Sequence, residues 1–245
     1  MNIFFTFLYQ PIYNLLVLFY DILPFNDLGV AIILLTILIK GLLFPLTFKT
    51  LKVQRDMQAI QPKIAAIREQ YKNDKEQQAR ELMKIYQENN VNPLASCLPL
   101  LIQLPIFIAL FRVLQAGLHT VNGDILYGFI PNPGTMNIMF AGIIDLTAIS
   151  VPLAILAAIA QYLQVKRTAM QKPAPEVAGK PGTKDEELAA NMNKTMMYFM
   201  PLLTLMIGTT SLPAGVMLYW LTTTILTIIL YAVFLPVKKT ATQEE

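Results

Sequence analysis

Chemically reactive side chains are scarce in this chain of 245 residues. It has one cysteine, Cys97, and one histidine, His119, which excludes a disulfide within the chain and argues against a protein-built zinc site. No histidine base accompanies Ser96, Ser150 or Ser211 within a predicted span, and no glycine-lysine pair has the spacing of a phosphate-binding loop. We therefore predict that the protein is not an enzyme, hydrolyses no ATP, and uses no cofactor or metal.

Charged residues are also few, and apolar residues are abundant: the chain is 14% charged and 55% apolar. Because a helix rises about 1.5 Å per residue, about 20 apolar residues are enough to cross a bilayer. The apolar stretches predict an all-α membrane protein with five transmembrane helices, over 28–48, 93–112, 149–165, 194–211 and 213–236. Several of them contain proline, which spanning helices tolerate where neighbours satisfy the freed carbonyl groups.

Most of the positively charged residues lie in three segments of the chain. Nine Lys and Arg fall between Lys49 and Lys84, six between Lys166 and Lys194, and two lie at the C-terminus. The remaining two are Lys40 and Arg112. Since positive charge accumulates on the cytoplasmic side, the charged segments and the C-terminus are predicted to be cytoplasmic. Five spans then place the N-terminus outside.

This topology assigns the connecting segments. It places residues 113–148 in an outer loop, 166–193 in a cytoplasmic loop and 237–245 in a cytoplasmic tail. The loop 166–193 is rich in proline and glycine, so we predict that it is mobile. Arg112, at the outer end of its span, is interpreted as an interfacial anchor.

Residues 1–27 allow two interpretations. Five polar residues project within an arc of about 120° on a helical wheel, which leaves a broad apolar face: Asn2, Thr6, Gln10, Asn14 and Asp21. This pattern favours an amphipathic helix lying in the outer interface and kinked at Pro11. The alternative is a sixth span over 4–23.

The segment 49–92 carries a helical pattern. Apolar residues recur there at steps of three and four, which predicts one apolar stripe on each of two charged helices: Met57, Ile60, Ile64, Ile67 and Tyr71, then Ala79, Leu82 and Tyr86. Asn73 and Asp74 can end the first helix and cap the second. We predict a cytoplasmic helical hairpin that stands off the membrane. Its charged face is either simply solvated or docks a partner.

Lys40 stands alone in the apolar run 28–48. An ionisable group near the middle of a span costs about 2.5–3.5 kcal/mol on insertion scales, so its presence calls for an explanation. One explanation is snorkelling toward Lys49, which lies about 13 Å farther along the helix. The other, which we favour, is a polar cavity inside the protein.

Six strings resemble one family in order and spacing: LTILIKG at 35–41, QPKI at 61–64, VNPL at 91–94, PLLIQLPIF at 99–107, FMP at 199–201 and LPAGVMLYW at 212–220. They are similar to the YidC-type membrane protein insertases, relatives of the Oxa and Alb proteins of organelles. The resemblance covers residues from about 29 to 236.

The resemblance implies five core spans, a cytoplasmic hairpin, and a polar groove closed on the outside. A basic residue of the first span lies in that groove, and Lys40 occupies its position. The family usually has arginine there, and lysine keeps the charge but lacks the planar fork that binds a carboxylate through two hydrogen bonds. The other groove positions fall on Thr36, Gln103, Gln164, Tyr219, Trp220 and Thr224; the last replaces a more common amide.

The resemblance also implies the activity and the partners. Members help newly made proteins insert into and fold in the bacterial plasma membrane without ATP. The implied partners are nascent membrane proteins and the lipid bilayer, together with the ribosome, the Sec translocon and signal-recognition targeting factors. Sequence-specific nucleic-acid binding is not expected. A small secondary transporter is the alternative, although the chain shows no internal repeat.

Overall fold

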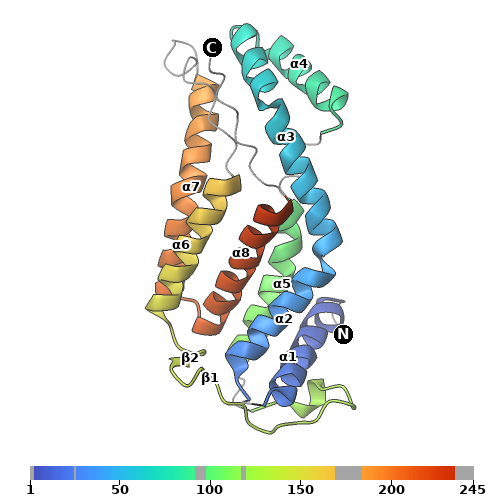
Figure 1. Cartoon of the computed structure of the whole chain (residues 1–245), viewed down its shortest axis with the longest axis vertical. Helices are drawn as coiled ribbons and strands as arrows, with labels where there is room; N and C mark the ends of the chain where they lie inside the picture. The colour runs from blue at the N-terminus through green and yellow to red at the C-terminus, as the bar shows by residue number, and fades with distance from the viewer. Residues whose placement is uncertain (1–2, 25, 92–97, 117–119, 169–183, 235–245) are drawn as a thin grey trace.

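The computed structural model describes residues 3–24, 26–91, 98–116, 120–168 and 184–234. Within these ranges the structure is helical apart from one short β-hairpin and connecting loops. Figure 1 shows α8 in the middle, with α6 and α7 on one side and α1, α2 and α5 on the other. The helical hairpin α3–α4 projects from one end, here called the hairpin end, and residues 120–150 close the other, the loop end.

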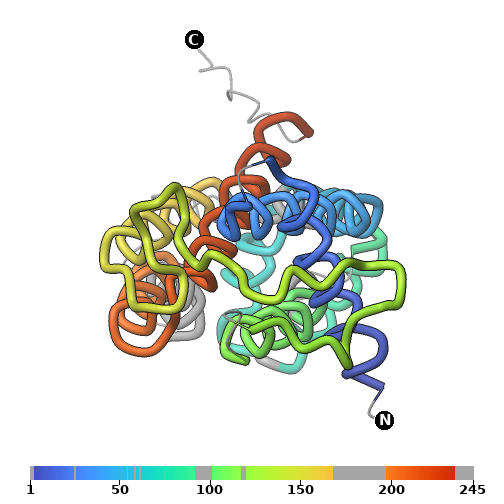
Figure 2. Tube along the Cα trace, turned by 90° about the horizontal axis from the view of Figure 1, so that it is seen from below, coloured from blue at the N-terminus to red at the C-terminus, as the bar shows by residue number. Residues whose placement is uncertain are grey.

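The N-terminal helix is part of the packed bundle. It begins as the π-helix η1 (Phe5–Tyr9) and continues as α1 (Gln10–Ile22), whose apolar face packs on α2. In Figure 2, which looks along the long axis, this dark blue segment is seen from the side. It therefore runs across the molecule more than along it. Whether it lies in the interface or spans the bilayer stays a prediction.

The first apolar run is bent. Helix α2 (Leu28–Leu42) is followed by α3 (Phe44–Gln70) at an angle of 63°. Pro45 explains the break, because it has no N–H to donate to the carbonyl of Gly41, while Leu43 N still donates to Ile39 O (3.0 Å). Helix α3 therefore starts before the predicted end of the span at residue 48.

Helix α3 pairs with α4 (Lys75–Glu88) in a hairpin that has its own small core. Met57, Ile60 and Ile64 are buried there against Val91, with Leu82 packed at the edge. Asp74 caps α4 by accepting a hydrogen bond from Gln77 N at 3.0 Å.

Helix α5 (Leu98–Gln115) leads into the loop end, which holds a 3₁₀ turn (Gly123–Ile125) and the antiparallel strands β1 (Met139–Phe140) and β2 (Ile144–Asp145). The ring of Phe140 lies where a side chain at Gly29 of α2 would be, so this contact depends on glycine. The loop end thereby packs directly on the start of α2.

Helices α6 (Val151–Thr168), α7 (Lys184–Thr210) and α8 (Ala214–Phe234) form the other side of the bundle. The structure differs here from the predicted loop 166–193, because helix is present up to Thr168 and again from Lys184. The run of strong helix formers EELAA at 186–190 accounts for the early start of α7. The rest of that loop, Cys97, His119 and the tail 237–245 lie outside the described residues.

By length and hydropathy, one helix in the described ranges is suited to cross a membrane, Ala214–Phe234. A second is added if α2 and the start of α3 are one broken span. Helices α5 and α7 contain apolar segments that are shorter, Leu101–Gln115 and Met197–Thr210. The all-α prediction is confirmed, and the count of five spans stays a prediction.

The main core lies toward the loop end. Large side chains from α2, α5 and α8 are fully buried there, among them Leu28, Ile32, Leu110, Val113 and Met217. Helix α1 covers this core from the side with Leu16 and Val17, both 0% exposed. The loop end of the bundle is therefore tightly filled with apolar side chains.

Side chains of α1 hold the loop end in place. Asn14, which is 1% exposed, donates to Ile125 O (3.0 Å) and accepts from Tyr127 N (2.6 Å). The hydroxyls of Tyr13 and Tyr20 accept from Asn122 N (2.8 Å) and Asn137 N (2.7 Å). These bonds replace the pairing that an irregular loop cannot supply to its own backbone.

Candidate functional site

A groove of about 500 Å³ lies between five helices. Its walls come from α2, α3, α5, α6 and α8. Its polar lining consists of Lys40, Thr47, Thr50, Gln103, Gln164, Tyr219, Trp220, Thr223, Thr224, Thr227 and Tyr231. Apolar side chains such as Leu43, Ile102 and Phe107 fill the space between them. The groove therefore offers hydrogen-bonding groups within an otherwise apolar helical bundle.

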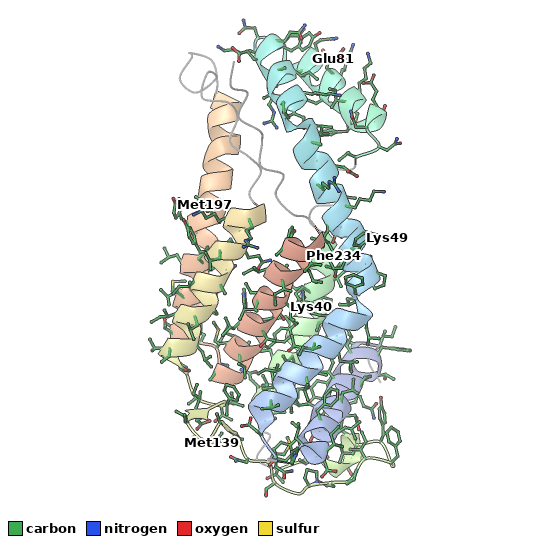
Figure 3. The ribbon with its side chains drawn as sticks, in the orientation of Figure 1. Lys40, Lys49, Glu81, Met139, Met197 and Phe234 are labelled. Atoms are coloured by element: carbon green, nitrogen blue, oxygen red, sulfur yellow. The ribbon has the colours of Figure 1, made fainter. Side chains whose placement is uncertain are left out.

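Lys40 provides the charge of the groove. It lies near the end of α2, and Figure 3 shows it midway along the bundle, between α2 and α8. Its ammonium donates to Thr227 Oγ1 at 3.4 Å. In the part of the chain that the structure describes, no carboxylate forms an ion pair with Lys40. An ammonium has three N–H groups, so two remain for a bound group or water.

The opposite wall is organised by Gln103 and Tyr219. The Gln103 amide donates to the Tyr219 hydroxyl and so joins α5 to α8. Trp220 stacks edge-on against Phe107, with ring centroids 5.5 Å apart. Such pairs prefer this T-shaped geometry, which fixes the rings at one end of the groove.

Two other predicted residues occupy less accessible positions. Thr224 lines the groove but is buried, and its hydroxyl donates to Trp220 O at 2.8 Å. Thr36 is 1% exposed, donates to Ile32 O at 2.6 Å, and is not among the residues that line the groove. One helical turn thus separates the packed core at Thr36 from the groove at Lys40.

The sequence analysis missed the lining residues from α3 and three from α8. Thr47, Thr50 and Leu51 come close only because the chain bends at Leu43. The α8 residues had a signal in the sequence, since hydroxyl side chains recur at steps of four, at Tyr219, Thr223, Thr227 and Tyr231. This spacing puts them on neighbouring turns of one helix face.

The groove ends at the apolar core of the loop end. Leu35 and Thr36 on α2, Leu110 on α5 and Met217 on α8 are all buried, and they lie toward the loop end from Lys40, Gln103 and Thr223. A polar segment entering from the hairpin end would therefore meet closely packed apolar side chains beyond the groove. The groove can hold a polar group inside the bundle, and buried apolar side chains of the described residues lie beyond it toward the loop end.

Comparison with known proteins gives the class of this helical, grooved protein. The family model of the 60Kd inner membrane protein matches residues 18–240. This match covers most of the chain, and the chain therefore belongs to the 60Kd inner membrane protein family, which is the family of the YidC insertases.

Several relatives carry the name "Membrane protein insertase YidC". One from Pelobacter propionicus is 35% identical over 91% of this chain and 38% of its own length. One from Fusobacterium nucleatum is 34% identical over 83% of this chain and 84% of its own length. One from Streptomyces avermitilis is 31% identical over 81% of this chain and 49% of its own length. The chain thus spans less than half of two of these relatives and most of the third.

Proposed function

We propose that this protein is a membrane protein insertase of a bacterial inner membrane, with nascent membrane proteins as its clients. The family and the names of its relatives support this class of activity. In this proposal the chain makes five spans, with the N-terminus outside and the hairpin end and C-terminus in the cytoplasm. The charge asymmetry of the loops supports that orientation.

The observation that carries the mechanism is the position of Lys40 in the groove, with the filled apolar core on its loop-end side. In this proposal the groove opens at the hairpin end. A newly made protein must move a short polar tail through a layer that offers no hydrogen bonds. A hydrated groove would let the tail travel part of the way in a polar environment. Only the distance across the apolar core would remain dry.

Lys40 is the residue that would attract acidic tails. A carboxylate about 4 Å from its ammonium gains up to about 4 kcal/mol at an effective dielectric near 20. That gain is similar to the cost of a charge at mid-membrane, about 2.5–3.5 kcal/mol. Thr227 already accepts one N–H of Lys40. The ammonium would offer a client a compact point charge, because it lacks the planar pair of donors of an arginine.

The other groove residues would act on the uncharged part of the client. Gln103, Gln164, Tyr219 and Thr224 supply hydrogen-bonding groups, and the Trp220 ring closes the space beside Phe107. We place Thr36 in the wall beneath the groove, because it is buried and bonded to its own helix. No ATP is required, because burial of the client's own apolar span in lipid can drive insertion.

The charged hairpin would recruit clients. Its two helices share a core of their own, so their outer faces stay available to a ribosome, a targeting factor or the Sec translocon. Deleting residues 53–90, which keeps the groove residues Thr50 and Leu51, should then abolish insertion while the rest of the chain still assembles. Full activity after this deletion would show that the hairpin is not needed to recruit clients.

Charge at position 40 gives the sharpest test of the groove mechanism. We expect Lys40→Ala to reduce insertion of a client whose translocated tail carries Asp or Glu by at least ten-fold, because about 1.4 kcal/mol corresponds to a factor of ten. Lys40→Arg should keep or improve it. The measurement is insertion into vesicles that contain the purified full chain, with acidic and neutral tails compared.

Lys49→Ala is the matched control for this test. Lys49 is exposed on α3 and does not line the groove, and Figure 3 shows it nearer the hairpin end than Lys40. It should leave insertion of both clients unchanged. Equal insertion of acidic tails by the wild type and Lys40→Ala would remove the electrostatic part of the mechanism.

A further inference from the structure

One face of α8 carries a row of hydroxyl groups along the groove. Tyr219, Thr223, Thr227 and Tyr231 follow one another at steps of four residues, and all four line the groove. We call them the hydroxyl row. Each step rises about 6 Å along the helix. The row is therefore a regular series of polar groups inside the bundle, on the wall that faces Lys40.

The hydroxyl groups of the row differ in their hydrogen bonds. The Tyr219 hydroxyl accepts from Gln103, and Thr227 donates to Thr223 O (2.7 Å) and accepts from Lys40 (3.4 Å). Thr223 Oγ1 is buried beside the Tyr219 phenol but makes no well-formed hydrogen bond to any described residue. A buried hydroxyl without a partner is unfavourable, so an additional group is expected to bind there.

The spacing of the row matches an extended polypeptide. In an extended chain, backbone groups on one side recur every two residues, which is about 6.4–6.8 Å. This is close to the rise of one step of the row. An extended segment has unpaired N–H and C=O groups, whereas a client helix has already bonded its own. A hydroxyl can donate to a C=O group or accept from an N–H group; Thr227, whose hydrogen is already bonded to Thr223 O, can only accept.

We propose that the hydroxyl row of α8 binds the backbone of a client segment in extended conformation, with Lys40 beside it to receive an acidic side chain. This rests on the proposed insertase function and adds a conformation and a set of contacts to it. The row recognises backbone rather than side chains, so the groove accepts tails of differing sequence. Charge at position 40 then favours acidic tails among them.

The first experiment reads the conformation of the client. A photoreactive residue is placed at ten successive positions of a neutral tail in a stalled nascent chain, and crosslinks to α8 of the full-length wild type are mapped by mass spectrometry. We expect the yield to be high at every second position. A period of three to four residues, equal yields at all positions, or no crosslinks to α8 would overturn the proposal.

The second experiment removes the hydroxyls without changing side-chain shape. Thr223→Val and Thr227→Val should each lower the initial rate of insertion of a neutral-tailed client about five-fold, as expected for the loss of one hydrogen bond. Thr222→Val is the matched control, because Thr222 lies on the same helix, bonds only Leu218 O (2.8 Å), and does not line the groove. It should insert the client at the wild-type rate.

The outcomes separate the hydroxyl row from the function itself. If the wild type inserts the client and all three valine variants do so equally well, the proposed role of the hydroxyl row is overturned and the insertase proposal stands. If the wild type inserts no client, both proposals fail. The folded yield of each variant is measured in parallel, and Thr223→Ser and Thr227→Ser should restore the rate, because serine returns the hydroxyl.

Discussion

The two ends of the bundle are built from the same three helices in opposite ways. Toward the loop end, α2, α5 and α8 contribute side chains such as Ile32, Leu110 and Met217, which are buried. Toward the hairpin end, the same helices contribute Lys40 and Gln103 to the groove. The change occurs within about one turn on α2, between Thr36 and Lys40. The same three helices thus contribute both a buried apolar core and a polar-lined groove.

The two ends also use polar side chains differently. At the loop end, Asn14, Tyr13 and Tyr20 each accept a hydrogen bond from a backbone N–H of the loop, and Asn14 also donates to Ile125 O. In the groove, Lys40 donates to Thr227 alone among the described residues, and Thr223 Oγ1 makes no well-formed hydrogen bond. The loop end thus uses polar side chains to hold backbone, whereas the groove retains hydrogen-bonding capacity at these two residues.

The largest effect is expected on stability, when two apolar side chains of α5 are shortened, one in the core and one in the groove. Leu110→Ala should destabilise the protein by about 2–5 kcal/mol, because it leaves a cavity in the filled core of the loop end. Ile102→Ala, two turns earlier on α5, should cost less than about 1 kcal/mol, since it only widens an existing groove. Unfolding of the purified protein in mixed micelles measures both, and equal losses would contradict the contrast between the two ends.

A smaller effect is expected from releasing the loop end. Asn14→Leu removes the acceptor of Tyr127 N and one donor to Ile125 O, which should cost about 1–3 kcal/mol. Limited proteolysis should then cut the segment 120–140 faster than in the wild type. Asn132→Ala is the control, because Asn132 is exposed in the same loop and bonds only Gly134 N. Unchanged cleavage in Asn14→Leu would show that α1 does not hold the loop.

The smallest expected effect concerns a polar pair outside the groove. The Thr204 hydroxyl donates to the Gln161 amide between α7 and α6, and both residues are buried. Hydrogen bonds between helices in membranes contribute about 0.6 kcal/mol on average, so Thr204→Val should lower stability only slightly. Client insertion should not change. A large loss of insertion at full folded yield would mean that the functional region extends beyond the groove.

The sequence predicted the helical class and, through the family resemblance, six of the eleven polar residues that line the groove. Lys40 was conspicuous because a lone charge in an apolar run demands a polar environment. The resemblance also put Thr36, one turn before Lys40 on the same face, in the groove. Helical spacing gives the face but not the depth, and the structure places Thr36 in the packed wall.

The parts that sequence analysis missed depend on contacts between distant residues. Asn14 belonged to a polar arc that was interpreted as facing the interface, whereas it is buried against residues more than 100 positions away. Such contacts leave no periodic pattern in the chain. Thr47 and Thr50 reach the groove because of the bend at Leu43, and Pro45 signals a break without giving its direction.

The most direct test of the central claim is the accessibility of three positions from the two sides of the membrane. In a Cys97→Ser background, single substitutions Lys40→Cys, Gln103→Cys and Thr36→Cys are treated with a small water-soluble thiol reagent. We predict labelling at 40 and 103 from the hairpin side only, and little labelling at 36 from either side. Asn132→Cys in the exposed loop is the control for the opposite side. Labelling at 40 and 103 at equal rates from both sides, or from neither, would contradict a hydrated groove closed by the apolar core.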